Sequence, residues 1–254
     1  MTSVELHHVD EGPRDAPVLV LSGSLGSTLE MWRPQAQLAD AFRVIRIDHR
    51  GHGGSPVPPG PYRMADLAGD AIALLDALGL ERVAWCGLSL GGMVGMYLGS
   101  EAPQRLTSLT LCCTTANFPD LTPWRDRIAA VTANGTAPIA EAVVSRWFTP
   151  GFAEQNPDVV AEAEAMMAGT DDAGYAACCE AIVAWDHRDR LPAVAVPTLV
   201  IGGSADLATP VDPHSRTLAD TIPGARLAVL DGAHLATVEQ AAEATALIAA
   251  NAAP

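Results

Sequence analysis

Residues 83–98, VAWCGLSLGGMVGMYL, begin as an apolar strand and continue as a helix, with Gly87-Leu88-Ser89-Leu90-Gly91 between the two. A serine on a tight turn between a strand and a helix is typical of a nucleophile elbow, which exposes the hydroxyl above the sheet. Glycines around the serine avoid the clashes that larger side chains would cause in such a turn. The alternative interpretation is a glycine-rich turn with an inert serine, and the pentapeptide alone does not decide between them.

Partners for the serine lie at the expected places later in the chain. A serine nucleophile needs a base and an acid that orients the base, and an elbow serine is followed first by the acid and then by the histidine. Asp206 lies just past a strand predicted at 197–203, and His234 just past a strand predicted at 226–232. Sites form where parallel strands end. The sequence therefore predicts Ser89, Asp206 and His234 as a catalytic triad.

Other acids and histidines fit the pattern less well. Asp212 and Asp231 are alternative acids, but Asp231 is too close to His234 in the chain to be aimed at it independently. None of the remaining histidines has the required order and position, so we expect structural or solvent-facing roles for His7, His8, His49, His52, His187 and His214.

An oxyanion needs two preorganised N–H donors. One is expected from the amide of Leu90, which follows the nucleophile, and the other from the loop after an early strand. The segment LSGSLGS, 21–27, is that loop, and we predict the amide of Ser24, with its hydroxyl as the weaker candidate. Gly23 and Gly26 allow the backbone to approach a ligand, although a plain glycine–serine turn is the alternative.

Short apolar runs alternate with helical patterns along the chain. Strands are predicted at 17–23, 42–48, 82–87, 106–113, 197–203 and 226–232, with an edge strand at 4–9. Helices are predicted at 64–80, 90–100, 211–222 and 236–250. This alternation predicts an α/β fold with a mostly parallel sheet and helices on both faces. We expect one domain over residues 1–254, with a helical lid insertion at about 118–191, where no strand pattern occurs.

The composition limits the function classes. The 254 residues carry a net charge of −15, and all 15 basic residues are arginine, so nucleic-acid binding, attraction to an anionic membrane and lysine chemistry are not expected. No apolar run is long enough to span a bilayer and no signal peptide is recognisable, which predicts a cytoplasmic protein. The five cysteines show no metal-ligand or disulfide spacing and are expected to be buried thiols. The sequence does not decide the oligomeric state, and a homo-oligomer remains one of the alternatives.

Four segments, in this order, resemble the α/β-hydrolase superfamily across nearly the whole chain: DHRGHGGS (48–55), GLSLGGM (87–93), GGSADLATP (202–210) and GAHLATVEQ (232–240). More narrowly, the chain is similar to the 3-oxoadipate enol-lactonase family of aromatic catabolism. That likeness is carried by SGSLGSTLEMWRPQ (22–35), WCGLSLGGMVGMYL (85–98), WRDRIAAV (124–131), RWFTPGF (146–152) and GYAACCEAI (174–182). The chain departs from the family at Gly23, where members often have Asn, and at Arg33, where they often have an acidic residue.

The resemblance implies that Ser89 opens a five-membered enol-lactone, 3-oxoadipate enol-lactone, to 3-oxoadipate through an acyl-enzyme, with no metal or other cofactor. The substrate anion then needs a cation despite the acidic background. The insertion offers Arg125, Arg127, Arg146 and Arg188, with Trp124 and Trp147 as walls. We predict a substrate pocket of Leu25, Trp124, Arg127, Arg146 and Trp147. For the arginines the alternative is a solvated helix face, and for Trp147 a core position.

Three other functions remain open at this point. The triad also suits a broader carboxylesterase or lactonase and a perhydrolase-like relative, and the fold can serve as a ligand-binding protein without turnover. A dehalogenase is disfavoured because it needs aspartate at position 89.

Overall fold

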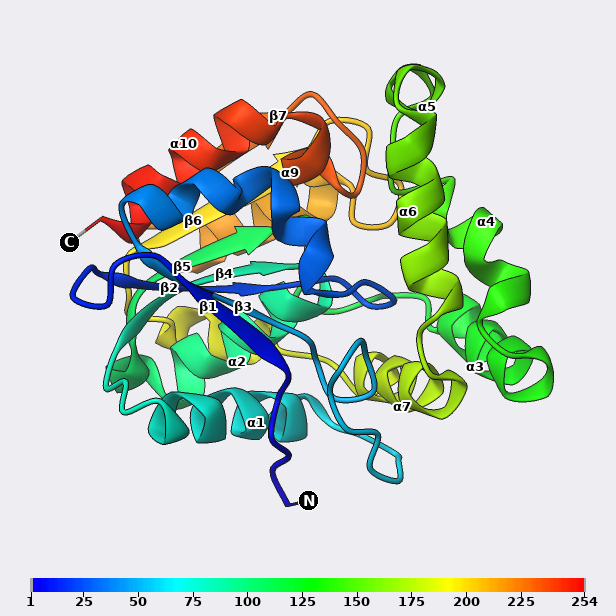
Figure 1. The fold of residues 1–254 in the computed structure, drawn as a ribbon, viewed down its shortest axis with the longest axis horizontal. Helices are drawn as coiled ribbons and strands as arrows, with labels where there is room; N and C mark the ends of the chain where they lie inside the picture. The colour runs from blue at the N-terminus through cyan, green and yellow to red at the C-terminus, as the bar shows by residue number, and fades with distance from the viewer. Residues whose placement is uncertain (1, 254) are drawn as a thin grey trace.

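A seven-stranded sheet forms the centre of the molecule in the computed structural model, which describes residues 2–253 (Figure 1). Its strands are β1 (His8–Glu11), β2 (Val18–Ser22), β3 (Arg43–Ile47), β4 (Val83–Leu88), β5 (Leu106–Cys112), β6 (Thr198–Gly203) and β7 (Arg226–Leu230). They lie in the order β1-β3-β2-β4-β5-β6-β7, and every pairing except β1 with β3 is parallel. Every residue of β4 and β6 is buried, as expected for central strands that are covered on both faces.

Helices cover both faces of this sheet. The α-helices are α1 (Met64–Ala77), α2 (Leu90–Glu101), α3 (Thr122–Asn134), α4 (Ala140–Val144), α5 (Pro150–Gln155), α6 (Pro157–Ala168), α7 (Asp172–Val183), α8 (Arg216–Thr221), α9 (Ala236–Glu239) and α10 (Ala241–Ala252). Short 3₁₀ and π segments are η1 (Leu29–Asp40), η2 (Pro103–Arg105), η3 (Ala137–Ile139), η4 (Arg188–Ala193) and η5 (Val211–Ser215). In Figure 1, α1 and α2 lie below the sheet, and η1 and α10 lie above it. The predicted fold class is therefore confirmed.

Three predicted elements were wrong in detail. The edge strand expected at 4–9 is β1, which begins only at His8, because Val4 instead donates its N–H to the Asp70 carboxylate at 2.7 Å. The helix expected at 211–222 is interrupted at Asp212, which is extended (φ −103°, ψ 122°) because a proline follows it. The helix expected at 236–250 breaks at Gln240 (φ −111°, ψ 49°) into α9 and α10.

The helices α3 to α7, called here the insertion helices, lie between β5 and β6 in the chain and stand at the carboxyl ends of the parallel strands (Figure 1). An isolated β-bridge joins Asn117 to Asp186, so the chain before α3 and the chain after α7 lie side by side. Helix α7 packs directly on the loop after β3. A Cβ built on Gly174 would lie 2.5 Å from the Cα of Gly51, so the two backbones touch.

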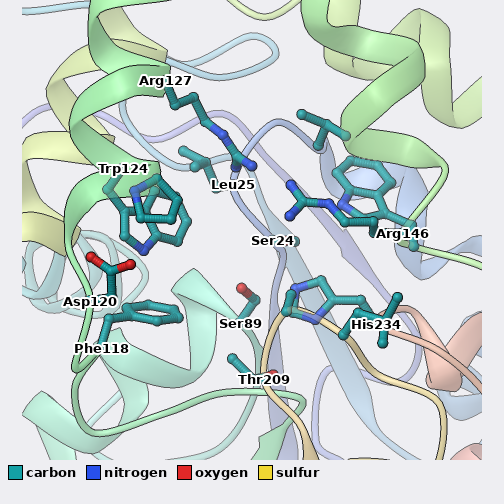
Figure 2. Close-up of a pocket in the computed structure, with 15 residues that line it drawn as sticks. Ser24, Leu25, Ser89, Phe118, Asp120, Trp124, Arg127, Arg146, Thr209 and His234 are labelled. Carbon is teal, nitrogen blue, oxygen red and sulfur yellow. The ribbon is translucent and has the colours of Figure 1, made fainter.

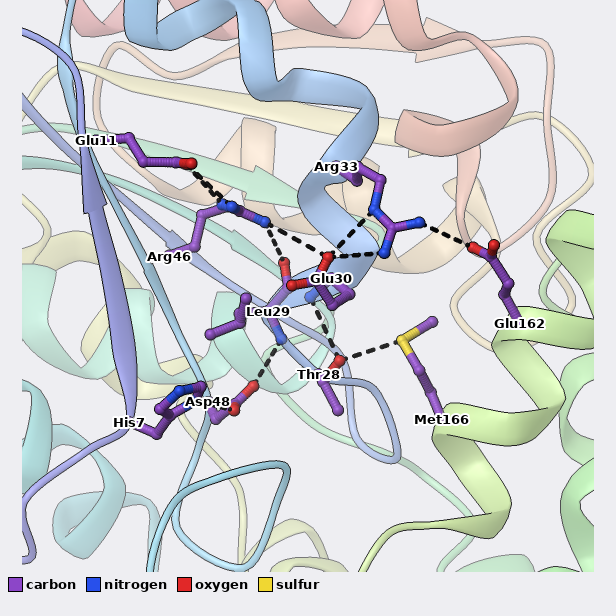
Figure 3. A network of polar contacts seen from close by, with 10 residues as sticks. All are labelled: His7, Glu11, Thr28, Leu29, Glu30, Arg33, Arg46, Asp48, Glu162 and Met166. Carbon is purple, nitrogen blue, oxygen red and sulfur yellow. Dashed lines mark hydrogen bonds and ion pairs between the residues drawn. The ribbon is translucent and has the colours of Figure 1, made fainter.

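A polar network at the start of η1 also joins the sheet to the insertion helices (Figure 3). The Leu29 N–H donates to Asp48 at 2.6 Å, which anchors the first turn of η1 to the end of β3. Arg33 pairs with Glu30 at 3.0 Å and with Glu162 of α6 at 3.3 Å. These arginine pairs are exposed, and exposed pairs stabilise a fold only slightly. At position 33, where the family often has an acidic residue, the arginine of this chain therefore pairs with two glutamates.

All five cysteines are buried and free, which confirms the prediction of buried thiols. Among the helices of residues 2–253, none has the length and the apolar composition that a membrane span requires.

Candidate active site

Ser89 lies on the turn between β4 and α2 with φ 53° and ψ −109°, a conformation that L-residues rarely adopt. Three hydrogen bonds hold its peptide units: Ser89 N–H donates to Cys112 O at 2.9 Å, and Ser89 O accepts the Thr114 hydroxyl at 2.7 Å and the Met93 N–H at 3.0 Å. Glycine is required beside it, because a Cβ on Gly87 would lie 2.0 Å from Gly91 O. Backbone strain of this kind persists where the surroundings enforce it, as at active sites.

Asp206 and His234 meet at the base of the same site, at the ends of β6 and β7. Asp206 Oδ2 lies 2.9 Å from His234 Nδ1, and it also accepts the Thr209 hydroxyl at 2.7 Å. Burial alone would raise the pKa of the Asp206 carboxyl, but the His234 imidazole and the Thr209 donors hold that pKa well below its usual value. A carboxylate bound to Nδ1 leaves Nε2 for proton transfer. The alternative acids lie elsewhere, since Asp231 binds the Ser204 hydroxyl and Asp212 binds Arg216.

Ser89 and His234 face each other across the floor of the cavity (Figure 2). No hydrogen bond joins these two described side chains. Such contacts are often long without substrate and tighten when the reacting complex forms.

The two predicted oxyanion donors, the amides of Leu90 and Ser24, differ in whether their N–H groups already have a hydrogen-bond partner. Leu90 is the first residue of α2, so its N–H has no partner within the helix. Ser24 lines the cavity, but its N–H donates to Met31 Sδ at 3.3 Å. A thioether is a weak acceptor. The loop itself is fixed against the elbow, because Gly91 N–H donates to Gly23 O at 3.0 Å.

Two histidines position the Ser24 loop. His49 Nε2 lies 3.1 Å from both Ser22 Oγ and Gly23 O, and the Gly26 N–H donates to His52 Nε2 at 2.9 Å. Burial lowers the pKa of His49 to about 4 and also lowers the pKa of His52. Both rings are therefore neutral near pH 7 and hold the loop through hydrogen bonds, which matches the structural role expected for them.

The cavity above Ser89 has a volume of about 190 Å³. It is lined by all five predicted pocket residues, Leu25, Trp124, Arg127, Arg146 and Trp147, together with Ser24, Ser89 and His234. Arg125 lies outside the lining, and Arg188 pairs with Asp186 at 2.6 Å. The lining also includes residues that the sequence did not predict: Phe118, Asp120, Pro123, Val143 and Leu207–Thr209. Of these, only residues 207–209 carried a signal, because they directly follow the predicted acid.

Arg127 of α3 and Arg146 after α4 direct their guanidinium groups toward one another above Ser89 (Figure 2). Arg127 lies 4.9 Å from the centre of the Trp124 ring and donates to the Tyr175 hydroxyl at 3.3 Å. Burial and the charge of Arg127 lower the pKa of Arg146. Neither arginine is paired with a carboxylate among residues 2–253. The cavity therefore presents two guanidinium groups to a ligand anion, with the Asp120 carboxylate as a further charged group in its lining. The described residues contain no group of three or more His, Cys, Asp or Glu that could hold a metal ion.

Comparisons with known proteins agree with this site. A family model described as the alpha/beta hydrolase fold matches residues 16–241. 3-Oxoadipate enol-lactonase 2 of Acinetobacter baylyi is 39% identical over 93% of this chain and 89% of its own length. A protein of Azorhizobium caulinodans that bears the name carbamate hydrolase RutD is 33% identical, over 85% of this chain and 83% of its own.

Among solved structures, the enol-lactonase of Burkholderia xenovorans LB400 superposes with a TM-score of 0.94 at 42% identity, covering 96% of this chain and 95% of that one. The resemblance and the enzyme class predicted from the sequence are thereby confirmed. The chain belongs to the α/β-hydrolase family and is a hydrolase.

Proposed function

We propose that this hydrolase opens a small enol-lactone that carries a carboxylate, and that its substrate is 3-oxoadipate enol-lactone. The observation that carries the proposal is the pair of arginines without carboxylate partners in a cavity of about 190 Å³, directly above Ser89. A cavity of this size suits a small ring rather than a long-chain ester, because pockets for drug-sized ligands usually exceed about 300 Å³. The relatives named as enol-lactonases support the same substrate.

In the proposed mechanism, Ser89 Oγ attacks the lactone carbonyl while His234 Nε2 takes the hydroxyl proton. Asp206 holds the imidazole through Nδ1 and stabilises the imidazolium that forms. The ring C–O bond then breaks, and the leaving enolate takes the proton from His234 and tautomerises to a ketone. His234 next activates a water that releases the second carboxylate from Ser89.

The oxyanion is stabilised by the amides of Leu90 and Ser24. For the Ser24 amide to act as a donor, its N–H must leave Met31 Sδ and donate to the oxyanion instead. An anionic oxygen is a far stronger acceptor than a thioether, so the exchange is favourable once negative charge develops. Arg127 and Arg146 hold the substrate carboxylate and so place the lactone carbonyl at Ser89.

We further propose that the insertion helices act as a lid on a single domain. Helix α3 supplies Trp124 and Arg127 to the roof of the cavity, and the segment between α4 and α5 supplies Arg146 and Trp147, whereas the triad follows strands of the sheet. The reaction class then resides in the sheet and the substrate preference in the lid.

The first test is covalent labelling. A fluorophosphonate is expected to label the native protein at Ser89, and Ser89→Ala is expected to lose both the label and turnover. A correctly folded protein that takes up no label would overturn the serine mechanism.

The second test is a substrate panel read against the Ser89→Ala control. The kcat/KM for 3-oxoadipate enol-lactone is expected to exceed that for p-nitrophenyl acetate by about 10³-fold or more, since the arginines add binding energy only for the anion. Similar values for the two would favour a broader esterase, and preferred release of ammonia from a carbamate would favour the activity named for the second relative. One stoichiometric release without a second cycle would indicate a binding protein.

A further inference from the structure

The carboxylate of Glu239 contacts two separate parts of the site. Glu239 is the last residue of α9, the one-turn helix that follows His234. Its Oε1 accepts the N–H of Ala233, the residue before His234, at 2.7 Å. Its Oε2 accepts the Thr149 hydroxyl at 2.6 Å, and the Thr149 N–H points at both oxygens at 3.2 and 3.3 Å. One side chain therefore binds the histidine loop and the segment between α4 and α5.

A second contact joins the same two segments. The N–H of Leu235, the residue after His234, donates to Trp147 O at 2.8 Å. His234 is thus flanked on both sides by main-chain groups that are tied, directly or through Glu239, to residues 147–149. We call these contacts together the Glu239 clamp.

The segment held by the clamp is also the one that carries part of the roof of the cavity. Arg146 and Trp147 both line the cavity, and Figure 2 shows Arg146 on the same wall as His234. The clamp therefore fixes the separation between a cation for the substrate and the general base. Thr149 is itself fixed, since its hydroxyl also accepts the Phe152 N–H at 3.3 Å as the N-cap of α5.

We propose that Glu239 is a positioning residue that sets the register between the anion-binding arginine Arg146 and the base His234. This inference rests on the proposed function, since it needs His234 as the base and Arg146 as the carboxylate site. A substrate whose carboxylate is bound by Arg146 reacts at Ser89 and His234 only if these groups are correctly spaced, and small misplacements lower the rate steeply. Arg146 does not bind a neutral ester, so the rate for a neutral ester does not depend on the distance between Arg146 and His234.

The test uses two esters of similar length, monomethyl succinate, which carries a carboxylate, and methyl butyrate, which does not. Turnover is followed by proton release in a pH-stat. In Thr149→Val, which removes one hydroxyl from the clamp, the ratio of kcat for monomethyl succinate to kcat for methyl butyrate is expected to fall about tenfold, as a loss of about 1.4 kcal/mol in orientation would give. The KM values are expected to change less than about twofold, because both binding groups remain.

Thr245→Val is the matched control. It removes a threonine hydroxyl that donates a 2.7 Å bond to Ala241 O inside α10, outside the clamp. The kcat ratio is expected to stay at the wild-type value. Glu239→Gln should also keep most of the ratio, because its amide oxygen can still accept the Ala233 N–H and its amide nitrogen can donate to the Thr149 hydroxyl.

A purely structural role predicts a different result. A loss of folded protein lowers kcat for both esters equally and leaves their ratio unchanged, so an unchanged ratio in Thr149→Val overturns the proposal. A ratio that falls equally in Thr245→Val overturns it as well. The test does not depend on Glu239→Ala, so it remains valid even if that variant does not fold. Failure of the proposed function shows separately, as absence of enol-lactone turnover by the wild-type enzyme that still hydrolyses both esters.

Discussion

Arg146 illustrates how one residue acquires a function from its surroundings. Its guanidinium is half-buried beside that of Arg127, and it forms no ion pair with a carboxylate of residues 2–253, although the charge of Asp206 acts on it. Two like charges in a small cavity repel one another, and a bound carboxylate removes that repulsion. The protein carries a net charge of −15, so leaving two arginines of its 15 without acidic partners in one cavity favours an anionic ligand.

We predict that Arg146→Met raises KM for 3-oxoadipate enol-lactone by about 10- to 100-fold, since methionine keeps length but offers neither charge nor N–H donors. The expected loss of about 1.5 to 3 kcal/mol is that of a hydrogen bond to a charged group. Arg188→Met is the control variant, because Arg188 is exposed and lies outside the cavity. Steady-state kinetics of the two variants measure the change in KM. Equal KM values in the two variants would remove Arg146 from the substrate site.

At the scale of elements, helix α7 depends on a contact between two backbones. Gly174 in its first turn touches Gly51, and the Cys178 thiol, one turn later, donates to Arg50 O at 3.7 Å. The loop after β3 and α7 therefore pack more closely than side chains would allow.

We predict that Gly174→Ala lowers the free energy of unfolding by about 1 to 3 kcal/mol, because the added methyl group overpacks this contact. Gly69→Ala in α1 is the matched control. A Cβ at Gly69 meets nothing within 4 Å, so alanine there is expected to stabilise the protein by up to about 1 kcal/mol. Urea denaturation of both variants measures the two effects, and equal changes would show that the contact tolerates a side chain.

At the scale of the whole molecule, buried neutral histidines make stability depend on pH. Burial lowers the pKa of His49 to about 4, from about 6.5 in an unfolded chain. Unfolding between these values is therefore coupled to proton uptake. The stability associated with His49 is fully present above pH 6.5 and is lost as the pH falls toward 4.

We predict that the unfolding free energy of the native protein falls by on the order of 3 kcal/mol more than that of His49→Gln between pH 7 and pH 4. Denaturant titrations of both proteins at several pH values test this. Protonation of carboxylates at low pH also reduces the repulsion that comes from the net charge of −15, and this change favours the folded state. Because both proteins share this effect, it cancels in the comparison. Parallel pH profiles for the two proteins would contradict it.

How far the sequence predicts this molecule depends on the range of the interactions. The parallel strands and the Ser89–Asp206–His234 order are readable, because apolar runs and chain order reflect local pattern and topology. The pocket arginines were predicted only as candidates, since their exposure depends on how the insertion helices pack. The Ser24–Met31 contact and the Glu239 clamp were missed because they join segments brought together only by the tertiary fold. Thr149 and Glu239, for example, are 90 residues apart.

The contact between Gly51 and Gly174 has a consequence for recombining this chain with its relatives. The two positions lie on different segments, one after β3 and one in α7, yet neither leaves room for a Cβ on the other. A chimera that takes the insertion helices from another parent must therefore inherit residues 51 and 174 together, or keep glycine at both. Crossover points that separate the pair would fail at the docking of α7, whatever the quality of the exchanged active-site residues.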